Sequence, residues 1–171
     1  MSNIIEPLGI ICEFSIGLAG FTGVMAIFAN SREPLSGSFR FRIASLMFLA
    51  FTPGFLSLLV ISLLYFDYGE MPSIRIGSIV FVVAILGLSI FTFRARRQIL
   101  SGPGQQLGEL VFWFTMVMVW IIMLFEAVNS LMSLEYSSGL FMAGLVGMLS
   151  LGAMIFFRIV TQIMSGNAYD T

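Results

Sequence analysis

The sequence has 171 residues, of which 58% are hydrophobic and only 10% are charged. Because an ordinary soluble domain carries about 25% charged residues, water is not the main solvent of this chain. The net charge of -1 and the lack of a long basic stretch exclude nucleic acid as a partner.

The sequence contains no histidine, and all 8 of its basic residues are arginines. Without histidine and lysine the chain cannot form a His-ligated haem or pigment site, a histidine base or a Lys-bound retinal. It also lacks a recognisable nucleophile with its base, a carboxylate pair for a metal and a phosphate-binding loop. We therefore expect no enzyme, no cofactor or metal of these kinds, and membrane lipids as ligands. Binding of quinone or pigment through apolar contacts stays open.

Five apolar runs fill most of the chain, and each is close to the roughly 20 residues that a helix needs to cross a bilayer. We predict an all-α polytopic membrane protein, a bundle of about five transmembrane helices in one domain over residues 1–171. Because the connections are short, sequential helices should be antiparallel neighbours. The predicted helices are 8–29, 43–66, 74–93, 110–131 and 139–160.

Arginines gather before the second predicted helix and after the third, whereas the other connections carry mostly acidic residues. Since basic residues in short loops stay on the cytoplasmic side, we expect the N-terminus outside and the C-terminus inside. The resulting cytoplasmic basic collar should contact anionic lipid headgroups, and docking of a cytoplasmic partner is the other interpretation. The collar consists of Arg40, Arg42, Arg94, Arg96 and Arg97.

Two acidic residues lie inside predicted helices, Glu13 in the first and Glu126 in the fourth. Because a charge in hydrocarbon is costly, such side chains usually face the bundle interior and find a partner there. We expect both to meet Arg75 in an intramembrane polar cluster. The interpretations are an ion pair that fixes helix register, or a proton or ion path. The full expected cluster is Glu13, Glu126, Arg75, Asn129 and Ser130, with Ser133 beside them.

Small residues recur four apart in the first and last predicted helices, which allows helix backbones to approach closely. Packing within one bundle and a subunit interface are both consistent with this pattern. The expected packing faces are Ser15, Ala19 and Gly23 in the first helix and Gly139, Ala143 and Gly147 in the last.

The second predicted helix contains Pro53 followed by Gly54 near its middle. Proline removes a backbone hydrogen bond, so we expect an interruption or hinge here. Either it is a packing kink, or the freed carbonyls near the midplane bind a substrate or ion.

The run Ala19-Gly20-Phe21-Thr22-Gly23-Val24 and the Arg40-Phe41-Arg42 start of the second helix carry a resemblance. This A-G-F-x-G-V and R-x-R pattern resembles small polytopic bacterial inner-membrane proteins of uncharacterised function. It covers about the first third of the chain, and the Met-rich fourth helix departs from it. The resemblance implies a bacterial inner (plasma) membrane and no activity.

The features favour a non-enzymatic membrane protein, either a homo-oligomer or an accessory (scaffold) subunit of a membrane complex, whose partners are lipids and membrane helices. The alternative is a small channel or a proton-coupled or ion-coupled transporter that uses Glu13 and Glu126.

Overall fold

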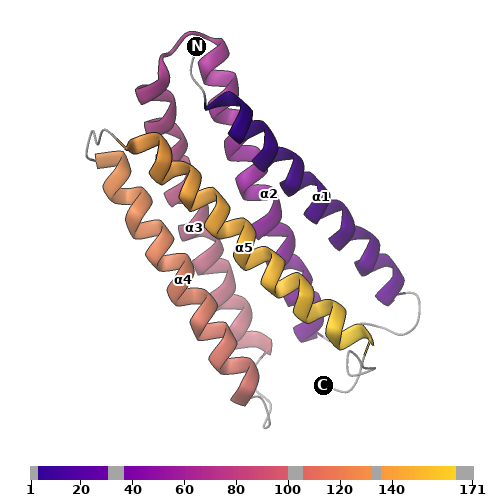
Figure 1. Ribbon diagram of the computed structural model, residues 1–171. Coiled ribbons are helices and arrows are strands. Elements are labelled where there is room, and N and C mark those ends of the chain that lie inside the picture. The colour runs from indigo at the N-terminus through magenta and orange to yellow at the C-terminus, as the bar shows by residue number, and fades with distance from the viewer. Residues whose placement is uncertain (1–3, 31–36, 100–105, 132–135, 165–171) are drawn as a thin grey trace.

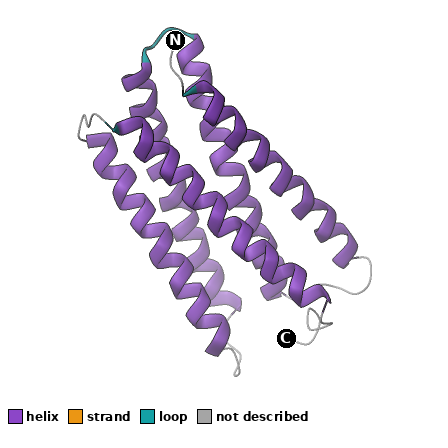
Figure 2. Ribbon diagram, in the orientation of Figure 1, coloured by secondary structure: helices purple, strands orange, loops and turns teal. Residues whose placement is uncertain are grey.

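The computed structural model describes residues 4–30, 37–99, 106–131 and 136–164, and Figure 2 shows that its regular elements are helices. In the described residues, five helices are long and apolar enough to cross a membrane. This confirms the predicted multi-pass helical bundle. The helices are α1 (Ile5–Asn30), α2 (Gly37–Tyr65), α3 (Glu70–Ile99), α4 (Gln106–Leu131) and α5 (Ser137–Met164).

Each helix agrees with its predicted range to within a few residues, and most helix ends extend beyond it. The exceptions are α2, which ends one residue early, and α4, which ends at the predicted residue. Each extension includes polar or charged residues, as at the end of α3, which continues past Arg94 to Ile99. Hydropathy marks the segment that crosses hydrocarbon, whereas the helix continues into the water interface, where polar side chains are solvated.

The helices run antiparallel in sequence order, so α1 begins and α5 ends at opposite ends of the bundle (Figure 1). Helix α5 contacts each of the other four helices, whereas α1 lies at the edge and contacts α2 and α5. The last helix is therefore the centre of the bundle, and the first has a free side.

The reversal between α2 and α3 is a tight turn with two left-handed residues, Asp67 (φ 61°) and Gly69 (φ 81°). The amide of Asp67 donates to the Leu64 carbonyl at 3.1 Å, and that of Tyr68 donates to the Leu63 carbonyl at 3.3 Å. This pattern is a Schellman motif, which satisfies the last carbonyls of a helix. The chain can therefore reverse beside the membrane without leaving these carbonyls unpaired.

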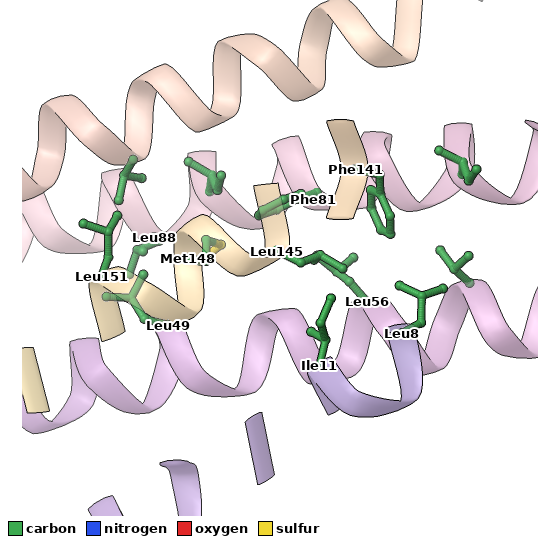
Figure 3. Close-up of a cluster of buried hydrophobic side chains, with 14 of the residues drawn as sticks. Leu8, Ile11, Leu49, Leu56, Phe81, Leu88, Phe141, Leu145, Met148 and Leu151 are labelled. Carbon is green, nitrogen blue, oxygen red and sulfur yellow. The ribbon is translucent and has the colours of Figure 1, made fainter. Parts of the chain in front are cut away.

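Large apolar side chains of α5 fill the space between the other helices (Figure 3). Phe141, Leu145 and Met148 are fully buried, and the Phe141 ring meets Phe81 of α3 edge to face at 6.4 Å. Such aromatic pairs stabilise a core beyond their buried area. The packing that holds α5 at the centre is therefore made by its bulky face.

The expected small-residue face of α5 is not packed as a whole within the described bundle, because Gly139 and Ala143 are exposed, and the subunit interface stays a prediction. Gly147 is partly buried, and a Cβ there would lie 3.0 Å from Ile122 of α4. The bulky side of α5 faces inward, so the glycine and alanine side is turned outward. On α1, by contrast, Ser15 and Ala19 are buried, and Gly23 lies near Met47 of α2.

No break occurs at Pro53, because α2 is one continuous helix through it, and the expected kink or hinge stays a prediction. Thr52 donates its hydroxyl to the Phe48 carbonyl at 2.8 Å, so hydrogen bonding continues beside the proline. A Cβ on Gly54 would lie 2.8 Å from the Ser15 Cβ. The Pro53-Gly54 pair is thus the place where α1 and α2 approach most tightly in this region, a packing feature.

Gly77 of α3 tests the packing, because a Cβ there would lie 2.6 Å from Val60 and 3.0 Å from Phe141. We expect Gly77→Ala to lower the free energy of unfolding by about 1–3 kcal/mol through overpacking. Thermal unfolding in detergent measures this. Gly87→Ala is the control, because Gly87 has nothing within 4 Å. Equal stabilities of the two variants would contradict the packing at Gly77.

Candidate functional site

A cluster of buried polar side chains lies between α3, α4 and α5. Glu126 and Asn129 come from α4, Ser78 from α3 and Ser137 from the first turn of α5. Their exposed fractions are 0%, 1%, 0% and 2% respectively. Polar groups inside a membrane bundle are costly, so this cluster is the first candidate for a functional site.

Hydrogen bonds join these residues into one chain. The Ser78 hydroxyl donates to Glu126 Oε2 at 2.7 Å. Asn129 Nδ2 donates both to the Ser78 hydroxyl at 3.3 Å and to the Ser137 carbonyl at 3.1 Å. The cluster therefore connects three helices through two side chains of α4.

Two buried oxygens of the cluster have no hydrogen-bond partner, Glu126 Oε1 and Asn129 Oδ1. The other unpartnered buried atoms in the described residues are serine and threonine hydroxyls, which can rotate toward carbonyls of their own helix. A carboxylate or amide oxygen has no such freedom, and leaving it unpaired in an apolar environment is costly. Two acceptors of the cluster, Glu126 Oε1 and Asn129 Oδ1, are thus left without a donor.

Gly144 of α5 makes room for the Glu126 carboxylate. A Cβ on Gly144 would collide with Glu126 Oε1 and would lie 3.0 Å from Phe81. The glycine, rather than a cavity, accommodates the acidic side chain, and the Phe81 ring closes the same space. Oε1 therefore lies close to the backbone of α5 at Gly144.

The described residues contain no group of three or more histidine, cysteine, aspartate or glutamate side chains that could hold a metal ion. Glu126 is the only ionisable residue of the α4 span Trp113–Leu131. The site is therefore a single carboxyl group among neutral hydrogen-bond donors and acceptors.

The structure separates Glu13 from Glu126, so the expected cluster of both is wrong. Glu13 is exposed on α1, and α1 does not contact α4 within the described helices. The reason is that α5, not α1, packs against α4 at Glu126. Burial of one acidic residue does not require burial of the other.

Arg75 and Ser130 lie near the cluster but have other surroundings. Arg75 is exposed one turn before Ser78, and it lines a pocket of about 230 Å³ with Met71, Pro72 and Ser137. The Ser130 hydroxyl donates to the Ala127 carbonyl of its own helix at 2.8 Å. Ser133 lies outside the described residues.

The basic collar lies at the other end of the bundle, where α2 begins and α3 ends (Figure 1). Arg40 and Arg94 are exposed, and Arg42 is partly buried. Arg96 and Arg97 belong to the last turns of α3. The arginines and the buried carboxyl group are thus separated along the bundle.

Sequence reasoning missed Ser78, Ser137 and Gly144. Serine and glycine are common in membrane helices as packing residues, so their types alone carry little signal. The available signal was the depth of each residue along its helix. Because α3 and α4 are antiparallel neighbours, the first half of α3, with Ser78, lies beside the last half of α4, with Glu126. Matching polar residues by depth would have found Ser78.

Comparisons with protein-family models, with curated proteins and with solved structures found no match.

Gly144→Ala should displace the Glu126 carboxyl group and lower the free energy of unfolding by about 1–3 kcal/mol. We expect the same change to cost clearly less in a Glu126→Ala background, because the colliding oxygen is gone. Thermal unfolding of the four chains of this double-mutant cycle, in one detergent, gives the coupling. Additive effects would show that Gly144 does not accommodate Glu126.

Proposed function

We propose that this protein is a non-enzymatic membrane protein that associates laterally with other transmembrane helices through the free side of α1. The association makes either a homo-oligomer or an accessory subunit of a larger membrane complex. The observation that carries the proposal is Glu13, an acidic side chain that is exposed within the Ile5–Ile27 span.

Three glycines share the helix face of Glu13. Gly9 lies four residues before Glu13, Gly17 lies four residues after it, and Gly20 lies three residues beyond Gly17. Nothing lies within 4 Å of a Cβ on any of the three glycines. Glycine faces let a second helix approach closely, which is the main source of attraction between helices in lipid. A partner helix on this face would also cover Glu13 and offer it a donor, which lipid tails cannot.

The position of α1 supports this role. It packs on α2 and α5 through Ser15, Ala19 and neighbouring residues, and its other side faces away from the bundle. Phe14 and Phe21 flank the glycines with exposed fractions of 68% each, so they can frame a partner. The face is available without any rearrangement of the bundle.

We further propose a bacterial inner membrane as the location, with the N-terminus outside. The support is the basic collar at the end of the bundle where α2 begins and α3 ends, together with the resemblance in the first two helices. In this orientation Glu13 and Glu126 both belong to the outer half of the membrane.

Filling the glycine face should abolish association. We expect Gly17→Leu with Gly20→Leu to leave folding intact, because both positions have open space, but to shift the protein to smaller assemblies. Cross-linking in lipid vesicles and co-purification of native membrane proteins measure the two kinds of association. Gly87→Leu is the matched control, since this α3 glycine is equally open. Unchanged assembly in the double variant would contradict the proposal.

A proton-coupled or ion-coupled transporter is the second candidate, and the buried carboxyl group of Glu126 favours it. Against it, apolar side chains fill the bundle beyond the polar cluster, among them Phe81, Ile85 and Val119. Proton or ion flux into vesicles that Glu126→Gln abolishes would favour transport over the association role.

A further inference from the structure

The donors of Ser78 and Asn129 in the Glu126 cluster are in use. The hydroxyl hydrogen of Ser78 goes to Glu126, and the two amide hydrogens of Asn129 go to Ser78 and to the Ser137 carbonyl. Two acceptors are left over, Glu126 Oε1 and Asn129 Oδ1. Glutamate and asparagine three residues apart on a helix lie on the same face, so these two groups are neighbours.

One added proton corrects this imbalance. A proton on the Glu126 carboxyl group turns one acceptor into a donor, and the remaining free acceptor beside it is Asn129 Oδ1. A hydrogen bond between the two groups would leave neither oxygen without a partner. The carboxyl group also becomes neutral, which removes the cost of a charge in hydrocarbon.

We propose that Glu126, Asn129 and Ser78 form an intramembrane binding site for one proton, held by Glu126 and shared with Asn129. The inference concerns α3, α4 and α5, and it goes beyond the association through α1. The two can therefore fail independently.

A metal ion fits this site less well than a proton. Gly144 and Phe81 enclose Oε1, where a Cβ already has no room, whereas a sodium or calcium ion needs several oxygens around an open centre. A divalent ion would in addition leave a net charge on a site with one carboxyl group. A proton needs neither space nor further ligands.

No second ionisable group of the packed elements faces Glu126 from inside the bundle. On α5 the chain from Ser137 to Phe157 has no ionisable side chain, and the Trp113–Leu131 span of α4 has none besides Glu126. On α3 the nearest charged residue is Arg75, which is exposed at the pocket that also reaches Ser137.

Infrared spectroscopy of the full-length protein in lipid vesicles tests the proposal, because a protonated carboxylic acid has a carbonyl band separate from that of a carboxylate. We expect the wild-type spectrum at neutral pH to contain such a band and the Glu126→Gln spectrum to lack it. Asn129→Leu should shift the band, since it removes the hydrogen-bond partner. Glu13→Gln, which changes the exposed glutamate of α1, should leave the band in place.

If Glu126→Gln loses a carboxylate band and keeps every acid band, the proposal is overturned. It is also overturned if adding sodium to the wild type removes the acid band, because that result would indicate a sodium site. Heavy-isotope carbon labelling of glutamate gives the same readout if a variant does not fold, because it shifts the band of a glutamate acid in the unchanged chain. Failure of the label to shift the band would also overturn the proposal.

Discussion

Hydrocarbon offers no hydrogen bonds, and this constraint governs the whole chain. Every peptide group within a span must be satisfied by its own helix, so the apolar runs fold as continuous helices. Hydroxyl side chains follow the same rule: Thr22, Thr52 and Thr161 each donate to the carbonyl four residues earlier. Pro53 within α2 is tolerated in the same environment. Beside it the Thr52 hydroxyl donates to the Phe48 carbonyl, and α1 packs closely at Gly54.

The two acidic residues inside the spans meet this constraint in different ways. Glu126 lies in the interior, where α3 and α5 supply neutral partners and Gly144 supplies room. Glu13 lies on the outside of α1, where the isolated chain gives it a glycine-lined face. The first arrangement stabilises one bundle around a carboxyl group, and the second leaves a surface whose polar group is best covered by another helix. Separate roles for the two residues follow from their separate positions.

The number of helices and their approximate ranges could be predicted from sequence, because run length alone decides whether a helix spans the membrane. The side that each helix buries could not, because lipid and protein interior are equally apolar. For Gly139 and Ala143 the sequence therefore left an interior face and a subunit interface open, and both residues are exposed. Glu126 and Asn129 were found because polar residues stand out in such runs, whereas Ser78 was recognisable only from its depth beside α4. Glu13 was misplaced because the rule assigns charged residues to the interior, whereas Glu13 is exposed on α1.

A topology map tests the account most directly. Reporters that are active on only one side of the membrane would be fused after each helix and at both termini of the full chain. Five spans predict that the reporter side alternates along the chain, with the N-terminus outside and the C-terminus inside. Both termini on one side would contradict the five-span bundle, and an alternating map of opposite sign would contradict the orientation alone.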